Sequence, residues 1–230
     1  MSDALIPRHV GYIVDGNRRW AKRHGIPTYE GHLAGYTALK DVLLETIEQG
    51  VEFVSLYTFS TENWQRAEEE VSHLMRLMMR LFKTDMKWLM QHDLKLVVLG
   101  TRDRLPAAMS AAIDDVEMKT ANNGAGTVAV CFNYGGQLEI VHALRTIMAE
   151  GIEPDEVTAQ TIDQHLWKAE VPAVDLIVRT SGEKRLSNFM LWRSPYSEVL
   201  FLEKLWPDMT KEDVSAILDE YAARERRLGK

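Results

Sequence analysis

Short apolar segments rich in β-branched and aromatic residues alternate along the chain with longer segments of helical periodicity. The strand-like segments lie near residues 10–14, 53–59, 94–99, 127–132, 174–178 and 198–202. This alternation favours the α/β class, with a mostly parallel six-stranded sheet flanked by helices. No repeat or linker interrupts it, so we expect a single domain over residues 1–230. The pattern leaves the order of the strands open.

Composition excludes several classes of protein. A net charge of −7 argues against a general polyanion binder, so nucleic acid is not an expected partner. The single cysteine, Cys131, lies in an apolar run and predicts neither a disulfide framework nor a cysteine metal cluster. No apolar run approaches the ~20 residues that cross a bilayer, and residues 1–7 lack the zones of a signal peptide. We therefore expect a cytoplasmic protein.

Residues 9–20 carry the most chemical information. An apolar strand is followed by Gly16, which permits a sharp turn, and by a short basic helix that includes Arg18 and Arg19. A helix N-terminus beside arginines binds anions, and a diphosphate suits it. Asp15 stands at the strand end, where a carboxylate beside phosphates is a typical Mg²⁺ ligand. The alternative is an aspartate that only caps the helix, with solvated arginines.

Polar clusters follow two further strands, at residues 60–66 and 179–187. Ligands of parallel sheets bind at the carboxyl ends of the strands, so we expect both clusters to share one crevice with Asp15. Arginine binds phosphate through its planar fork of donors. The crevice would hold enough fixed positive charge for two diphosphates, from Arg19, Arg66, Arg179 and Arg185.

A long helix is predicted over residues 68–90, with a broad apolar surface rich in methionine over residues 71–90. One interpretation is a helix buried on two sides, in the core or in a dimer. The other is that part of this surface lines a hydrophobic tunnel beside the sheet, for which adaptable methionines are suited. The sequence leaves both interpretations open.

These segments together resemble the cis-prenyltransferases, the undecaprenyl diphosphate synthase family. The resemblance runs from His9 to Gly229 and rests on blocks in the expected order, at residues 9–20, 31–35, 59–66, 133–136 and 179–188. It implies a Mg²⁺-dependent transfer in which an allylic prenyl diphosphate loses diphosphate. The carbon fragment then joins isopentenyl diphosphate and a cis double bond forms.

The resemblance also implies roles for individual residues. Asp15 would be the essential carboxylate at the Mg²⁺ ion, with Glu198 assisting. The allylic diphosphate would bind at Gly16, Asn17, Arg18, Arg19 and Trp20. The isopentenyl diphosphate would bind at Arg179, Arg185, Leu186 and Ser187. Substrate would be positioned by His32, Ser60, Thr61, Glu62, Trp64 and Arg66.

Two of these assignments have alternatives. Asn63 is a catalytic candidate for the proton-removal step, but an amide is a poor base, and diphosphate oxygens or water could accept the proton instead. His32 could instead be a helix-start histidine that only bonds to the backbone. The family further implies a homodimer in which Arg227 and Gly229 reach the neighbouring active site. Peripheral membrane association during product release is another expectation.

Departures from the family pattern bear on product length. Arg18 and the segment 192–195 resemble short-chain members, and the bulky Tyr36 would shorten a tunnel, whereas Thr58 and Gly126 point to a longer one. We expect a short or medium chain.

Two other functions remain possible in principle: a non-catalytic partner subunit and an irregular synthase that joins two allylic diphosphates. The intact Asp15 and Asn63 disfavour the first. The complete cluster at residues 179–187 disfavours the second.

Overall fold

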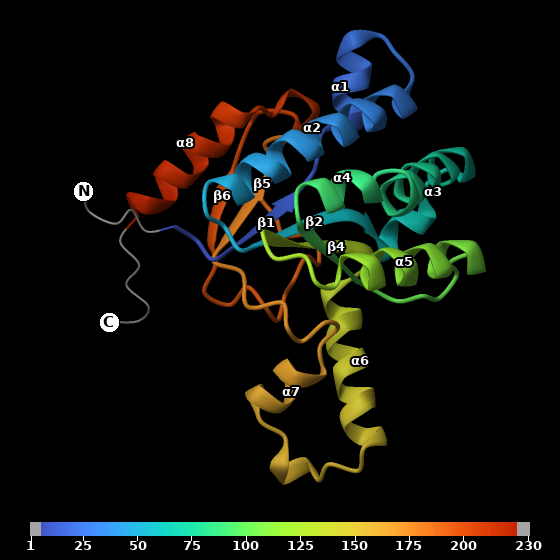
Figure 1. Cartoon of the computed structure of the whole chain (residues 1–230), viewed down its shortest axis with the longest axis vertical. Coiled ribbons are helices and arrows are strands. Elements are labelled where there is room, and N and C mark those ends of the chain that lie inside the picture. Colours follow the sequence, from blue (N-terminus) through green and yellow to red (C-terminus); the bar gives the residue numbers. More distant parts are fainter. Residues whose placement is uncertain (1–5, 225–230) are drawn as a thin grey trace.

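Six parallel strands form one sheet in the computed structural model, which describes residues 6–224 (Figure 1). The strands are β1 (His9–Ile13), β2 (Phe53–Ser60), β3 (Leu94–Leu99), β4 (Gly126–Tyr134), β5 (Leu176–Arg179) and β6 (Glu198–Phe201). Their spatial order is β3-β4-β2-β1-β5-β6, and every neighbouring pair is parallel. The predicted α/β class and six-stranded sheet are confirmed, and the sheet is parallel throughout.

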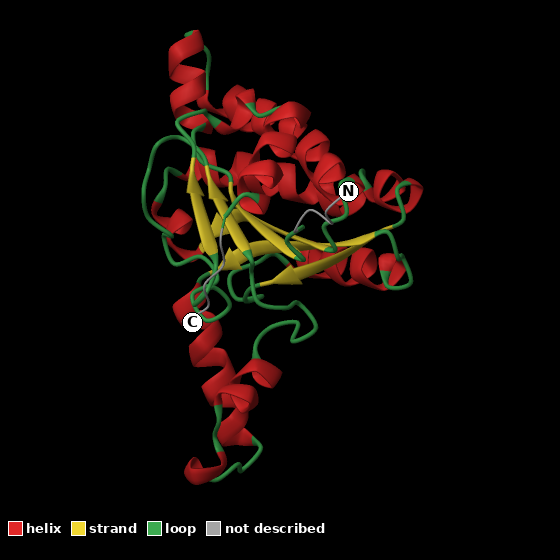
Figure 2. Cartoon of the chain, turned by 90° about the vertical axis from the view of Figure 1, so that its left-hand side faces the viewer, coloured by secondary structure: helices red, strands yellow, loops and turns green. Residues whose placement is uncertain are grey.

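Helices connect the strands. They are α1 (Asn17–His24), α2 (Thr28–Glu48), α3 (Glu68–Lys83), α4 (Met86–Gln91), α5 (Ala107–Thr120), α6 (Gly136–Ala149), α7 (Ala159–His165) and α8 (Lys211–Ala222). Short 3₁₀ helices are η1 (Thr61–Gln65), η2 (Pro154–Glu156) and η3 (Trp206–Asp208). α6 and α7 project away from the sheet as an arm, which both views of the chain show (Figures 1 and 2).

Side chains alternate between the two faces of the sheet, and each face has its own core. In β2, Val54 and Leu56 belong to the larger core, together with apolar side chains of α2, α3, α4, α5 and α8. Tyr57, the next residue of the strand, packs on the opposite face against Phe189 and Met190, which follow β5. The larger core is therefore helical, whereas loop residues build much of the smaller one.

The predicted helix begins at Glu68 as expected, but its continuation to residue 90 is wrong, because the helix breaks between α3 and α4. Asp85 lies at the break and is buried. It accepts a hydrogen bond from the Tyr36 hydroxyl and pairs with Lys40 at 2.7 Å. Both partners come from α2. Helical periodicity cannot reveal such a break, since tertiary contacts override local preference.

A buried histidine joins β1 to two neighbouring segments. His9 Nδ1 lies 2.9 Å from the carbonyl oxygen of Pro172, and Nε2 lies 2.7 Å from Ser55 Oγ. A carbonyl can only accept, so Nδ1 carries the proton and Nε2 accepts from the serine hydroxyl. This arrangement fits the neutral ring. Burial lowers the pKa of His9 from 6.5 to about 4.

Protonation of His9 should oppose folding at acid pH. Since the pKa is lowered to about 4 in the folded state, the contribution of His9 to the free energy of unfolding is complete above pH 6.5 and is lost towards pH 4. The loss is about 3 kcal/mol. Urea unfolding across this pH range should show a flatter pH dependence for His9→Gln than for the wild type. Parallel curves for the two proteins would contradict the assignment.

Candidate active site

The carboxyl ends of β1, β2 and β5 meet because β1 lies between the other two strands. The chain leaves β1 towards α1 and α2, on the helical face, but leaves β5 through a loop that packs on the opposite face. Neighbouring strands whose connections diverge in this way open a crevice, the usual ligand site of parallel sheets. Asp15 follows β1 and Arg179 ends β5, so both stand at this crevice.

The turn after β1 requires glycine. Gly16 has a φ of +113°, and a Cβ there would lie 3.0 to 3.1 Å from atoms of Leu205. α1 begins at the next residue. No side chain hydrogen-bonds to cap this end of the helix, and its first turn contains no acidic residue. The first N–H groups of α1 are therefore available to an anion.

α2 passes so close to this turn that it needs glycine at two positions. A Cβ on Gly31 would lie 2.3 Å from the backbone oxygen of Asn17, and a Cβ on Gly35 would lie 2.1 Å from Asn17 Oδ1. That side-chain oxygen is buried and has no hydrogen-bond partner among residues 6–224. The close contact fixes the first turn of α1 against α2.

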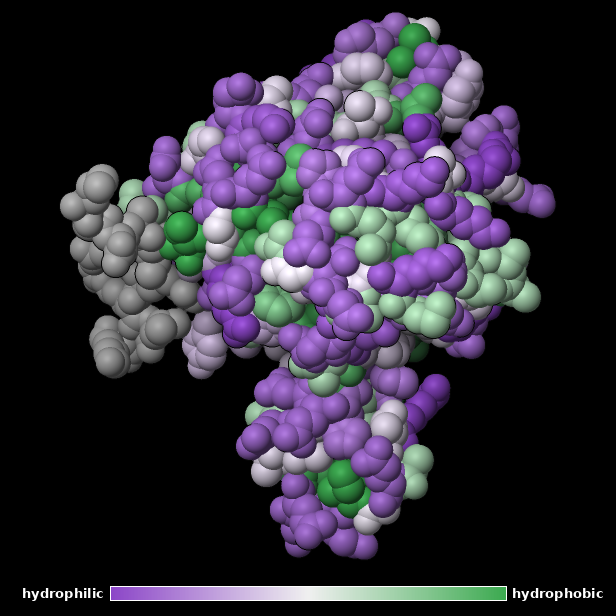
Figure 3. All heavy atoms as spheres, in the orientation of Figure 1, coloured by the Kyte–Doolittle hydropathy of each residue, from purple (hydrophilic) through white to green (hydrophobic). Residues whose placement is uncertain are grey.

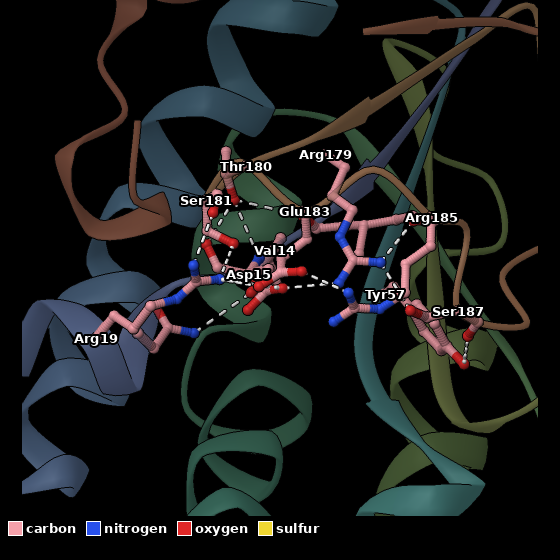
Figure 4. Close-up of polar contacts among 12 residues, drawn as sticks. Val14, Asp15, Arg19, Tyr57, Arg179, Thr180, Ser181, Glu183, Arg185 and Ser187 are labelled. Atoms are coloured by element: carbon pink, nitrogen blue, oxygen red, sulfur yellow. Dashed lines mark hydrogen bonds and ion pairs between the residues drawn. The ribbon is translucent and has the colours of Figure 1, made fainter. Parts of the chain in front are cut away.

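A buried arginine holds the Asp15 carboxylate (Figure 4). Arg179, whose side chain is only 4% exposed, donates to Asp15 Oδ2 at 2.8 Å. Its other terminal nitrogen donates to Ser187 Oγ at 2.7 Å and to the Arg185 carbonyl at 2.6 Å. The Thr180 hydroxyl donates to the Asp15 carbonyl at 2.6 Å and accepts from the Asp15 N–H at 3.1 Å. These contacts lock the ends of β1 and β5 together.

Arg19 approaches the same carboxylate from α1. It donates to the carbonyl and hydroxyl oxygens of Ser181, lies 3.7 Å from Asp15 Oδ2 and lies 3.4 Å from Glu183 Oε1. Glu183 also pairs with Arg185, across 2.5 Å. Both arginine contacts to Asp15 use Oδ2, and in the described chain none uses Oδ1. One carboxylate oxygen therefore stays available at the crevice.

A second set of basic side chains surrounds Glu70. Its Oε1 lies 2.9 Å from Arg66 and 3.2 Å from His32 Nε2, and its Oε2 lies 3.9 Å from Arg18. Burial raises the pKa of Glu70, but Arg66 and His32 outweigh burial and the pKa is lowered. Burial lowers the pKa of His32. Glu70 thus holds three side chains that all line the cavity described below.

The loop after β2 is shaped by its own side chains. Asn63 Oδ1 accepts the backbone N–H of Ser60 at 3.0 Å. Trp64 donates to Asn133 Oδ1 at 2.8 Å, and the Arg104 guanidinium stacks on its ring at 4.4 Å from the centroid. The oxygen of the Asn63 amide is therefore engaged in holding the loop.

These groups line a cavity of about 1160 Å³. The residues predicted from the sequence that line it are Asp15, Gly16, Asn17, Arg18, Arg19, His32, Ser60, Glu62, Asn63, Arg66, Arg179, Arg185 and Ser187. Apolar side chains of α2 and α3 continue the wall, namely Tyr36, Leu39, Leu74, Leu77, Met78 and Leu81. The prediction that three strand-end clusters share one crevice is confirmed.

Five predicted residues do not line the cavity. They are Trp20, Thr61, Trp64, Leu186 and Glu198. The Trp20 indole, for example, donates to Asp208 at 2.6 Å and so ties α1 to η3. The remaining two, Arg227 and Gly229, lie outside the described residues.

Sequence reasoning missed several residues of the site. Glu183 and Glu70 pair with its basic side chains, and Thr180 hydrogen-bonds to the backbone of Asp15. Asn188 lines the cavity and donates to Glu62 at 3.0 Å. Glu70 follows Arg66 by four residues, a spacing at which opposite charges attract along a helix, and this signal could have revealed the pair. Hydroxyl and amide groups carry no comparable signal.

Glu198 is not beside Asp15. It opens β6 and pairs in register with Leu176 at the start of β5, whereas Arg179 ends that strand. Its carboxylate instead pairs with Arg224 at 2.7 Å. Within one chain the structure therefore does not bring Glu198 to Asp15, and its assistance to a metal stays a prediction. The parallel register puts the first residue of β6 at the amino ends of the strands, whereas the crevice lies at their carboxyl ends.

A carboxylate and two basic clusters at the mouth of an apolar cavity define a site for an amphiphile with an anionic head. The sequence comparisons specify the class. Residues 13–229 match the family model described as putative undecaprenyl diphosphate synthase. An isoprenyl transferase of Thermotoga maritima is 42% identical over 226 residues, which are 97% of each chain. A decaprenyl diphosphate synthase of Mycobacterium leprae is 42% identical over 233 residues, covering 100% of this chain and 79% of that protein.

The fold comparison agrees. The structure matches lavandulyl diphosphate synthase from Lavandula x intermedia in complex with dimethylallyl diphosphate, with a TM-score of 0.94 and 35% identity over 98% of this chain and 99% of that one. The chain therefore belongs to the undecaprenyl diphosphate synthase family of prenyltransferases. None of the helices in the described part has the length and hydropathy that a bilayer crossing requires.

The buried arginine of the crevice should dominate anion binding. Arg179→Gln removes a charge already oriented by Asp15 and Ser187. In titration calorimetry, the binding free energy of inorganic diphosphate should become about 1.5–3 kcal/mol less favourable, which is roughly 10- to 150-fold weaker binding.

A matched control is available for this variant. Arg224 also pairs with a carboxylate, that of Glu198, but at the amino ends of the strands and away from the crevice. Arg224→Gln should leave diphosphate affinity unchanged. Equal losses in the two variants would mean that the crevice is not the anion site.

Proposed function

We propose that the protein joins an allylic prenyl diphosphate to isopentenyl diphosphate, with Mg²⁺, and forms a Z double bond. The observation that carries this proposal is the cavity, in which two basic clusters flank Asp15 and an apolar wall continues behind them. An anionic head beside a long apolar compartment suits a prenyl diphosphate better than a nucleotide or a sugar phosphate. Family membership supports the same chemistry.

The residues present suit a Mg²⁺ ion that arrives with its substrate. In the described part of the chain, no three His, Cys, Asp or Glu side chains are placed to share a metal. Mg²⁺ commonly takes only one or two protein carboxylates, keeps several waters and completes its shell with phosphate oxygens. Asp15, with Oδ1 still available, supplies such a ligand. When bound, the ion would neutralise charge on the departing diphosphate.

The anion-binding groups that line the cavity divide between the two substrates. The allylic diphosphate would occupy the N-terminus of α1, where Gly16 and Asn17 offer backbone N–H groups and Arg18 and Arg19 offer charge. The isopentenyl diphosphate would occupy the cluster of Arg179, Arg185 and Ser187. This division would place the two diphosphate groups on opposite sides of Asp15, because Arg19 and Arg179 both contact its carboxylate.

The reaction follows from this arrangement. The C1–O bond of the allylic substrate breaks, and the diphosphate leaves with the bonding electrons. The double bond of isopentenyl diphosphate supplies the electron pair of the new C–C bond, and loss of a proton restores a double bond. Arginines fixed before the reaction stabilise the developing negative charge without reorganisation. The proton would pass to a diphosphate oxygen or to water, since Asn63 is an amide.

We also propose that the apolar part of the cavity is a tunnel for the growing tail, and that the protein is a homodimer. Val141, Leu144 and Met148 of α6 are exposed, and Met148 is 77% exposed. An apolar helix face left open on a projecting arm suits contact with a second copy. Figure 3 shows apolar side chains on the arm among polar ones.

Removing the carboxylate of Asp15 should abolish turnover. Asp15→Ala deletes a metal ligand at a strand end and little packing, so we expect a rate at least about 10³-fold lower. The variant also removes the partner of Arg179, but the Asp15 side chain is one-third exposed, and a diphosphate can take the place of the lost carboxylate. The fold and most of the diphosphate affinity should therefore persist, as circular dichroism and calorimetry would show. Asp219→Asn on the exposed face of α8 is the control. A near-normal rate for Asp15→Ala would refute the assignment.

Product analysis tests the reaction itself. The isolated protein, supplied with Mg²⁺, isopentenyl diphosphate and either geranyl or farnesyl diphosphate, should form Z-polyprenyl diphosphates of short or medium length by mass spectrometry. A dominant product of eleven isoprene units would refute the short length. Products from allylic diphosphate alone would indicate an irregular synthase, and no product at all would indicate a non-catalytic subunit.

A further inference from the structure

Two loops border the diphosphate sites proposed above. The loop after β2, residues 60–66, reaches the allylic side through Arg66, which pairs with Glu70, the carboxylate that also pairs with α1. The loop after β5, residues 180–191, carries Ser187, which lines the cavity on the isopentenyl side. Each loop therefore borders the proposed site of one substrate, and a contact between the loops connects the two sites.

A single hydrogen bond connects these loops in the part of the chain that the structure describes. Asn188 Nδ2 donates to Glu62 Oε1 at 3.0 Å, and both side chains line the cavity. Burial raises the pKa of Glu62, but its hydrogen bonds, including the one from Asn188, outweigh burial and the pKa is lowered. Glu62 therefore stays ionised, and a hydrogen bond to a charged acceptor is stronger than one between neutral groups.

Asn188 is anchored independently of Glu62. Its carbonyl oxygen accepts the N–H of Gly136 at 2.7 Å, and its Oδ1 accepts the N–H of Gln137 at 2.9 Å. These are the first two residues of α6, whose N–H groups find no partner within the helix. The φ of Asn188 is +66°, a conformation in which asparagine is found more often than most residues. The start of α6 thus holds the side-chain amide that faces Glu62.

The segment that follows β4 fills the space between the two loops. A Cβ on Gly135 would lie 2.9 Å from Asn188 Nδ2 and 3.0 Å from Thr61 Oγ1, so a larger residue would displace one of them. Two residues earlier, Asn133 accepts from the Trp64 indole of the loop after β2. This segment therefore packs against both loops and keeps them at a fixed distance.

We propose that Asn188 is a positioning residue that couples the two substrate sites, so that a bound allylic diphosphate makes isopentenyl diphosphate bind more tightly. The proposal rests on the proposed function, because it takes the two sides of the cavity as the sites of these substrates. Each substrate orders its own loop, and the hydrogen bond from Asn188 to Glu62 transmits that order to the other loop. Such coupling acts equally in both directions.

Binding of two ligands that do not react measures the coupling. Isopentenyl diphosphate is titrated by calorimetry into the protein with Mg²⁺, with and without saturating geranyl S-thiolodiphosphate, an allylic analogue whose C1–S bond breaks slowly. The wild type should bind isopentenyl diphosphate at least about fivefold more tightly when the analogue is bound. The reverse titration should give the same ratio. A ratio of one, with both ligands bound, would overturn the proposal.

Asn188→Asp tests the hydrogen bond itself. The variant keeps the oxygen that accepts from Gln137, and a carboxylate suits a helix N-terminus, so the fold should persist. It replaces the donor to Glu62 with a second acceptor, and the ratio should fall to about one. An unchanged ratio in the folded variant would show that this hydrogen bond does not couple the sites.

A matched control and a second variant accompany this test. Gln137→Ala removes an exposed carboxamide beside the link but keeps the backbone N–H that Asn188 accepts, so it should keep the wild-type ratio. Loss of the ratio in this control as well would contradict the proposal, because the link is intact there. Should Asn188→Asp fail to fold, Asn188→Gly replaces it, since glycine adopts a φ of +66° readily and lacks the amide.

Turnover separates this proposal from the proposed function. In an active wild type, Asn188→Asp should raise the KM for isopentenyl diphosphate at least about fivefold at saturating allylic substrate, with a smaller change in kcat. If the wild type makes no prenyl product but Asn188→Asp still abolishes the binding ratio, the proposed reaction fails and the coupling stands. If the wild type is active and Asn188→Asp keeps the ratio, the coupling fails and the reaction stands.

Discussion

The ion pair between Asp15 and Arg179 organises the site, because it joins the ends of two strands that are far apart in the sequence. Arg179 is buried, so its charge needs the carboxylate, and Asp15 gains a fixed orientation in return. The same arginine orders Ser187 and the carbonyl of Arg185. A guanidinium and a carboxylate are thereby in place before any diphosphate binds, which is the form of preorganisation that stabilises a developing charge.

The two faces of the sheet contribute differently to this arrangement. Helices cover one face, and they provide both the anion-binding turn of α1 and the apolar wall of α2 and α3. The loop after β5 covers part of the other face and carries Arg185 and Ser187. Since the connections of β1 and β5 leave towards opposite faces, the crevice opens between them, and a head group held there would have its tail directed along the helices.

α2 contacts two distant segments that border the cavity, the turn after β1 and the break between α3 and α4. Near the crevice its glycines Gly31 and Gly35 pack against Asn17 and fix the turn that would receive a diphosphate. Tyr36, the residue after Gly35, donates a hydrogen bond to the buried Asp85. One helix thus fixes both the turn at the crevice and the break between α3 and α4.

The sequence by itself determined the fold class and most of the site. Strand periodicity, the glycine turn before α1 and the polar residues at strand ends are local signals, and parallel strands bring their carboxyl ends to one edge wherever each strand lies. The tertiary structure alone decided the strand order, the helix break at Asp85 and the position of Glu198 at the amino ends of the strands, away from the crevice. These features depend on partners distant in the chain, and no local spacing encodes which buried charge meets which partner.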